Sequence, residues 1–130
     1  MKTLVKLILT LSLVPATSWA NLTICKLEES SIGIKAISWD DNTGAAKVTD
    51  LLNNSYAGTV TLTRKHNDGK KVNIYIQYDK PYYGDDAAEY IVFPAGLNGF
   101  RVISVSYIVK EKKKYLNTSQ GNYSATCLSM

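Results

Sequence analysis

Apolar and polar residues alternate along two neighbouring stretches of the chain, Thr59–Lys65 and Lys71–Tyr78. A repeat of two residues is typical of a β-strand that buries one face and exposes the other. The segment between the two stretches, His66–Gly69, contains the dipeptide Asp-Gly, which favours a tight turn between antiparallel strands. The pattern therefore predicts a β-hairpin.

Further strands are predicted where short segments rich in Val, Ile, Thr and Tyr lie between turn residues. These segments are Leu22–Leu27, Ile32–Trp39, Tyr90–Phe93, Phe100–Val109 and Tyr123–Leu128. The longest of them carries Ile103, Val105, Tyr107 and Val109 on one face and two serines, Ser104 and Ser106, on the other. Together with Tyr90–Phe93, it predicts a second hairpin.

One segment, Ala45–Leu52, has a different spacing. Its apolar residues are Ala45, Val48, Leu51 and Leu52. Intervals of three and four residues are the repeat of an amphipathic helix. The spacing predicts a short helix at this place.

Six to seven short strands at regular spacing, with this one short helix, predict a mainly all-β fold: a small antiparallel β-sandwich or barrel. Residues 21–130 suffice for a single domain with a modest core. No linker, repeat or low-complexity stretch divides them. The pattern does not choose between sandwich and barrel.

The first 20 residues predict a secretory signal peptide. Lys2 and Lys6 precede an apolar stretch, Leu7–Val14, which Pro15 ends, and Ser18–Ala20 offers small residues before a cut. This order of charge, apolar core and small residues is the one that export machinery reads. The apolar stretch is shorter than the ~20 residues needed to span a bilayer, and no later segment predicts a transmembrane helix. We expect a secreted or periplasmic protein.

The two cysteines lie near opposite ends of the exported part. In an oxidising compartment, Cys25 and Cys127 are most simply a pair. A disulfide between them would tie the first strand to the last and require their Cα atoms to lie within about 7 Å.

The charge argues against nucleic acid as a partner. The whole chain has 15 Lys and Arg against 11 Asp and Glu, and without Lys2 and Lys6 its net charge falls from +4 to +2. One basic run, Lys110–Lys114, is typical of a solvated loop, although contact with an anionic surface is an alternative.

No catalytic constellation stands out. The single histidine, His66, lies in the predicted turn, and catalysis there would need a nucleophile and an orienting acid beside it. If both cysteines are oxidised, no thiolate remains for catalysis or for metal binding. We therefore expect no enzymatic activity, no cofactor and no metal.

Four acids and four tyrosines lie within Tyr78–Tyr90, which we expect to form a loop between two strands. Tyrosine offers a rigid apolar face with a polar tip, which suits contact with a protein or with a sugar ring. A plain polar loop, a calcium site or a paired-carboxylate hydrolase site are the alternatives. The candidate binding surface consists of Tyr78, Tyr82, Tyr83, Asp85, Asp86 and Tyr90.

About a third of the chain resembles a known family. Tyr78–Gly84 and Tyr115–Gly121 both read Tyr, five residues, Gly, and Pro94–Val105 follows the first of them. This arrangement resembles the Greek-key motif of βγ-crystallin-type domains, which include calcium-binding bacterial members. The resemblance implies a Greek-key fold and a calcium site; residues 21–70 do not share it.

Three functions follow from these observations. The first is a small exported binding protein without enzymatic activity, which recognises a protein or a glycan through the Tyr- and Asp-rich segment. The second is an inhibitor of an extracellular hydrolase such as a lysozyme or a protease. The third, implied by the resemblance, is a βγ-crystallin-like calcium-binding domain.

Overall fold

The computed structural model of this chain describes residues 21–28, 33–66, 69–95 and 99–130, and within these ranges it contains eight strands and no helix. In chain order the strands are β1 (Leu22–Leu27), β2 (Ile34–Asp40), β3 (Ala45–Asp50), β4 (Ser55–His66), β5 (Gly69–Tyr82), β6 (Asp85–Pro94), β7 (Phe100–Lys110) and β8 (Lys113–Ser129).

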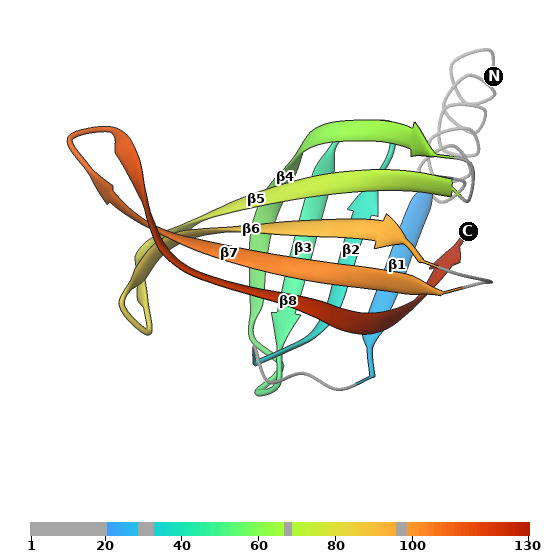
Figure 1. Cartoon of the computed structure of the whole chain (residues 1–130), viewed down its shortest axis with the longest axis horizontal. Helices are drawn as coiled ribbons and strands as arrows, with labels where there is room; N and C mark the ends of the chain where they lie inside the picture. The colour runs from blue at the N-terminus through green and yellow to red at the C-terminus, as the bar shows by residue number, and fades with distance from the viewer. Residues whose placement is uncertain (1–20, 29–32, 67–68, 96–98) are drawn as a thin grey trace, which may run out of the picture.

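The strands form one closed antiparallel barrel in sequence order (Figure 1). Each strand pairs with its neighbours along the chain, and β1 pairs with β8. Closure pairs the terminal strands, which would otherwise be the two edges of the sheet. The all-β prediction is confirmed and the barrel is the correct alternative, with eight strands in place of six to seven.

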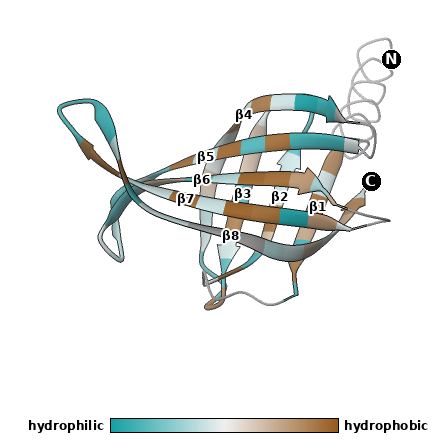
Figure 2. Cartoon of the chain, viewed as in Figure 1, coloured by the Kyte–Doolittle hydropathy of each residue, from teal (hydrophilic) through white to brown (hydrophobic). Residues whose placement is uncertain are grey.

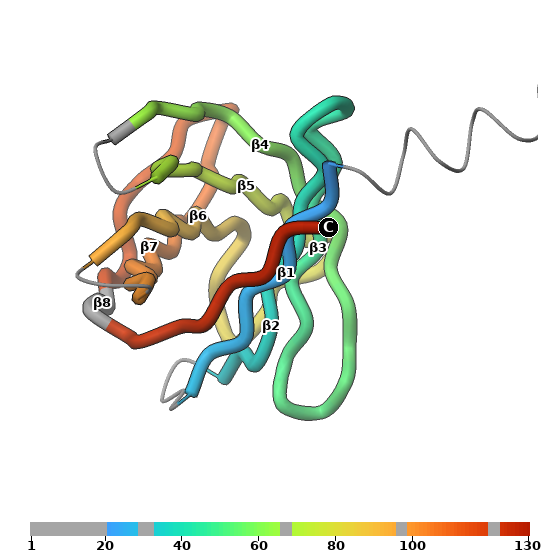
Figure 3. Tube along the Cα trace, turned by 90° about the vertical axis from the view of Figure 1, so that its right-hand side faces the viewer, coloured from blue at the N-terminus to red at the C-terminus, as the bar shows by residue number. Residues whose placement is uncertain are grey.

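The predicted disulfide is present and lies at the seam of the barrel. Cys25 of β1 and Cys127 of β8 are directly paired residues, with their Sγ atoms 2.03 Å apart and their Cα atoms 4.0 Å apart. The first and last strands therefore run side by side (Figure 3). The bond joins strands that hydrogen bonds already hold together.

The two halves of the barrel cross each other. In Figure 1, β1–β3 run steeply and β5–β8 run almost horizontally, while β4 bends from one direction to the other. A bulge between Val60 and Leu62 accompanies this bend. At Gly58, an added Cβ would lie 2.7 Å from Cγ1 of Ile76 and 2.8 Å from the carbonyl oxygen of Tyr75. Glycine thus permits the close approach of β4 to β5.

The core lies between these two halves. The alternation predicted for β5 holds, since Val72, Ile74 and Ile76 are fully buried. In Figure 2, β6 is apolar along most of its length, and the strands of the hairpin ends are more polar. Partly buried aromatic residues, among them Tyr56 and Tyr78, pack against the apolar cluster at its rim.

The helix predicted over Ala45–Leu52 is wrong. This segment forms β3, and in it Ala46, Val48 and Asp50 are buried while their neighbours are more exposed. A spacing of three to four residues over so short a segment also fits a strand followed by a turn. Pairing with β2 and β4 satisfies the backbone groups that a helix would satisfy internally.

Two segments predicted as loops are also parts of strands. Tyr78–Tyr90 contains the end of β5, a two-residue turn and the start of β6, and Lys110–Lys114 contains the turn between β7 and β8. Both hairpins extend beyond the barrel (Figure 1). Their residues alternate weakly in polarity, so the strands are longer than the apolar pattern indicates.

The predicted signal peptide, residues 1–20, lies outside the described residues and stays a prediction. In the described ranges, no helix has the length and apolar character needed to cross a bilayer.

Candidate binding pocket at one end of the barrel

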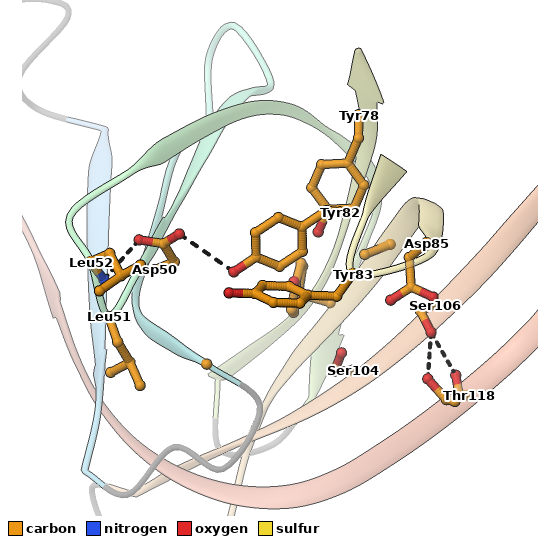
Figure 4. A pocket seen from close by; sticks show the side chains of 13 residues that line it. Asp50, Leu51, Leu52, Tyr78, Tyr82, Tyr83, Asp85, Ser104, Ser106 and Thr118 are labelled. Atoms are coloured by element: carbon orange, nitrogen blue, oxygen red, sulfur yellow. Dashed lines mark hydrogen bonds between the residues drawn. The ribbon is translucent and has the colours of Figure 1, made fainter. Parts of the chain in front are cut away.

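A pocket of about 460 Å³ opens at the end of the barrel where the β3–β4 and β5–β6 turns lie (Figure 4). Strands from both halves of the barrel contribute to it. The β5–β6 hairpin supplies most of its aromatic lining, namely Tyr78, Tyr82, Tyr83 and Tyr90.

An irregularity in β5 shapes this aromatic wall. Between the pairs Gln77–Ala87 and Tyr82–Asp85, β5 contains four residues and β6 only one. The extra residues form a large bulge, which bends the strand and re-aims its side chains. Tyr78 and Tyr82 both line the pocket from the two ends of this bulge.

The turn that follows places Tyr83 at the mouth. Tyr83 has φ of 49° and Gly84 has φ of 86°, which is the left-handed pair required by the tightest hairpin turn. Gly84 adopts this conformation freely, whereas an aromatic residue does so rarely. Tyr83 is 83% exposed. The hairpin therefore holds a large aromatic side chain in water.

The aromatic rings form one connected cluster. Tyr82 lies at its centre, with ring centroids 5.2 Å from Tyr56, 5.2 Å from Tyr78 and 4.6 Å from Tyr83. The ring planes of Tyr82 and Tyr83 stand at 85° to each other. Edge-to-face contacts of this kind stabilise the arrangement and fix the ring positions.

Asp50, at the end of β3, anchors the cluster from the other half of the barrel. Its carboxylate accepts hydrogen bonds from the backbone N–H of Leu52 at 2.9 Å and of Asn54 at 2.8 Å. It also accepts hydrogen bonds from the hydroxyls of Tyr56 and Tyr82, each at 3.4 Å. One side chain thus connects the β3–β4 turn to the β5–β6 hairpin.

The protonation states in this cluster follow from burial and hydrogen bonding. Burial raises the pKa of Asp50, but hydrogen bonds from Asn54, Leu52 and Tyr82 outweigh it, so the pKa lies below its ordinary value of 3.8. Burial, and then the charge of Asp50, raise the pKa of Tyr82 to about 12. Burial is also the main cause of the raised pKa of Tyr78. At neutral pH the carboxylate is ionised and the phenols are neutral donors.

The part of the lining next to the aromatic wall is polar, and Ser104 is paired directly with Tyr90 of β6. Ser104 and Ser106 of β7 face the interior with the buried Val102, so the outer face of β7 carries Ile103 and Val105. Ser106 exchanges a hydrogen bond with the hydroxyl of Thr118 on β8. Hydroxyl groups can both donate and accept, which suits a ligand rich in hydroxyls.

Two leucines complete the mouth. Leu51 and Leu52, in the β3–β4 turn, are 56% and 73% exposed and line the pocket across from Tyr83 (Figure 4). A cluster of exposed apolar side chains at a cavity mouth is typical of a contact surface.

The structure brings together five of the six predicted site residues. Tyr78, Tyr82, Tyr83, Asp85 and Tyr90 all line the pocket. The sixth, Asp86, does not: its Oδ2 accepts a hydrogen bond of 2.8 Å from the backbone N–H of Val109 in β7. Its role is in the strand framework.

Asp50, the two leucines and the hydroxyl residues Ser104, Ser106 and Thr118 were not predicted as site residues. Asp50 and the leucines come from β3 and the turn after it, far from the Tyr- and Asp-rich segment in the sequence, whereas the hydroxyl residues come from β7 and β8, the two strands that follow β6. The serines of Phe100–Val109 carried no distinct signal, because serines that alternate with apolar residues also fit a strand whose polar face meets solvent.

The remaining carboxylates of the segment do not converge. Asp79 is exposed on the bulge, and Glu89 accepts a hydrogen bond from Tyr107 at 3.4 Å outside the pocket. In the described part of the chain, no group of three or more His, Cys, Asp or Glu side chains is placed to hold a metal ion. His66 ends β4, with its backbone paired to Gly69.

The topology also differs from the resemblance noted in the sequence. A Greek key needs a strand that pairs out of sequence order, whereas the described strands pair only with sequence neighbours and across the β1–β8 seam. Comparison of the chain with protein families, with curated proteins and with solved structures finds no match.

Proposed function

We propose that this chain is an exported, non-enzymatic binding protein that takes about one or two sugar rings of a glycan into the pocket at the end of its barrel. The observation that carries the proposal is that tyrosine rings and the hydroxyls of Ser104, Ser106 and Thr118 line the same open cavity. Export is supported by the disulfide between Cys25 and Cys127, because such bonds persist in oxidising compartments.

The size and lining of the pocket suit a saccharide. Its volume of about 460 Å³ lies within the range of small-molecule sites, about 300–1,000 Å³. A sugar ring has an apolar face of C–H groups, which stacks on aromatic rings, and a rim of hydroxyls. The exposed Tyr83 offers a ring face, and Ser104, Ser106 and Thr118 offer hydroxyl partners.

The pocket is also rigid in the parts that would hold the ligand. The hydrogen bonds to Asp50 and the ring contacts of Tyr82 position the aromatic wall before any ligand enters. A preformed site loses less conformational entropy on binding than a mobile loop does. The segment predicted as a loop is part of the paired strands β5 and β6, which hold the tyrosines in place.

The test is calorimetric titration of the mature protein with a panel of soluble mono- and oligosaccharides. We expect at least one sugar to bind and Tyr83→Ala to weaken that binding by about tenfold. Tyr115→Ala is the matched control, since Tyr115 is 52% exposed on β8 and does not line the pocket. No binding across the panel, or equal effects of the two variants, would contradict the proposal.

A second function is favoured by the apolar mouth. Leu51, Leu52 and Tyr83 project from two tight turns at one end of the barrel. Rigid apolar side chains of this kind could enter the cleft of an extracellular hydrolase and block it.

Inhibition assays against lysozymes and proteases test this second function. Leu52→Asp should abolish any inhibition, whereas Leu62→Asp, at another exposed leucine on β4, should not. Full activity of every enzyme at micromolar protein would exclude the inhibitor function.

A further inference from the structure

The charged side chains known to line the pocket are acidic. Among the described residues, the lining includes the carboxylates of Asp50 and Asp85 and no Lys, Arg or His. The predicted exported part as a whole is net positive, so the pocket contrasts with the average of the protein. An anionic group in the pocket would meet only negative charge, whereas a cation would be attracted.

The two carboxylates differ in whether an oxygen remains to accept a hydrogen bond from a ligand. Asp50 uses both of its oxygens to accept hydrogen bonds from the protein. Asp85 accepts one hydrogen bond at Oδ1, from Nδ2 of Asn117 at 2.6 Å. Among the described residues, no hydrogen bond reaches its Oδ2. Asp85 lies beside Ser106 and Thr118 at the polar side of the pocket (Figure 4).

The aromatic side of the pocket also favours a cation. The rings of Tyr82 and Tyr83, 4.6 Å apart and nearly perpendicular, form two adjoining walls. The face of an aromatic ring carries partial negative charge and attracts an ammonium group. The same contact occurs elsewhere in this protein, where Nζ of Lys114 lies 4.8 Å from the ring centroid of Tyr75.

We propose that the sugar bound in this pocket carries a protonated amino group, so that the ligand is an amino sugar. The ammonium group is held by Oδ2 of Asp85 and by the ring of Tyr83, and the sugar hydroxyls face Ser104, Ser106 and Thr118. This inference rests on the proposed function, because it names the class of sugar that the same pocket takes.

Three methyl glycosides that differ in one substituent test the inference. They are those of glucosamine, N-acetylglucosamine and glucose, titrated into the mature protein at about pH 6, where a sugar amine is protonated. We expect the glucosamine glycoside to bind at least about tenfold more tightly than the other two. Equal binding of all three would overturn the amino-sugar inference and leave the proposed function standing. No binding by these or by any other sugar would overturn both.

A pair of matched variants locates the cation. Asp85→Asn removes the charge and retains an oxygen that can accept from Asn117, and Asp79→Asn removes an exposed charge outside the pocket. We expect Asp85→Asn to weaken binding of the glucosamine glycoside about tenfold and Asp79→Asn to leave it unchanged. If the two variants behave alike, Asp85 does not hold the ammonium group. Unchanged fluorescence of the buried Trp39 confirms that both variants are folded.

The pH dependence adds an independent readout. Binding of the amino sugar should decline as its amine loses its proton at about pH 8. Binding of the glucose glycoside should stay level there, because the pKa of Tyr82 is raised to about 12 by burial and by Asp50. A level profile for the amino sugar would contradict the inference. A glucosamine trimer that binds more tightly than the monomer would identify a polymer as the source; equal affinity would identify the free sugar.

Discussion

Removal of the disulfide should destabilise the barrel strongly, and the structure gives the magnitude. Cys25 and Cys127 are 102 positions apart in the sequence, nearly the full length of the domain. In the chain-entropy account, a cross-link across about 100 residues restricts the unfolded chain by about 4.7 kcal/mol at 25 °C. The folded state loses little, because the backbone pairing of β1 with β8 does not depend on the sulfur atoms.

The double variant Cys25→Ala/Cys127→Ala is the suitable perturbation. Cys25 is fully buried, so alanine keeps the site apolar where serine would bury a hydroxyl. Trp39, which is buried in the core and is the one tryptophan of residues 21–130, reports unfolding by its fluorescence. Urea unfolding should show a loss of about 4.7 kcal/mol. The midpoint of thermal unfolding should fall by about 20 °C.

Reduced wild-type protein is the control, since it lacks the bond and keeps both side chains. It and the double variant should agree within about 1 kcal/mol, and both should unfold with a steeper dependence on urea than the oxidised protein, because their unfolded chains expose more surface. If either form is within about 1 kcal/mol of the oxidised protein, strand pairing alone closes the barrel and the argument from chain entropy is refuted.

Three further predictions concern single side chains. In a titration followed by near-ultraviolet absorbance, Tyr82→Phe should remove one phenol whose pKa is about 12. Because this pKa is raised above the ordinary value of 10.0, the stability that Tyr82 contributes should be complete below pH 10.0 and lost as the pH rises towards 12. Asp50→Asn should make the free energy of unfolding less dependent on pH in acid. The pKa of Asp50 is lowered, so the stability that its carboxylate contributes is present above pH 3.8 and lost as the pH falls further. An unchanged pH dependence of unfolding in acid would contradict this. Gly58→Ala should destabilise the barrel by about 1–3 kcal/mol in urea unfolding, because its Cβ would lie 2.7 Å from Ile76; a neutral result would mean that β4 shifts at little cost.

The sequence by itself determined the fold class and the closing bond. The alternation in Lys71–Tyr78 required one face to be buried, and Val72, Ile74 and Ile76 are fully buried in the structure. Such local periodicity survives in the fold because burying alternate side chains is the main stabilising contribution of a strand. Two cysteines without other partners likewise allowed only one internal pairing.

Local patterns were misleading where pairing partners determined the outcome. Ala45–Asp50 is a strand because β2 and β4 flank it, although its spacing fits a helix. The hairpin around Tyr83 and Gly84 extends strands through polar residues that show no apolar alternation. In both cases, hydrogen bonds to neighbouring strands outweigh intrinsic preference.

The pocket likewise contains residues that the sequence predicts and residues that only the tertiary structure brings together. Its aromatic half was predictable, because Tyr78, Tyr82, Tyr83, Asp85 and Tyr90 lie within one short segment. The rest of the lining comes from other strands, with Asp50 at the end of β3, Ser104 on β7 and Thr118 on β8. Ser104 is paired directly with Tyr90 of β6, whereas Asp50 meets Tyr82 only because the barrel brings β3 and β5 to the same cavity. The sequence specifies which residues share a face of a strand, whereas the number of strands and their crossing decide which faces meet across a cavity. Those contacts join residues far apart in the chain, and no local pattern encodes them.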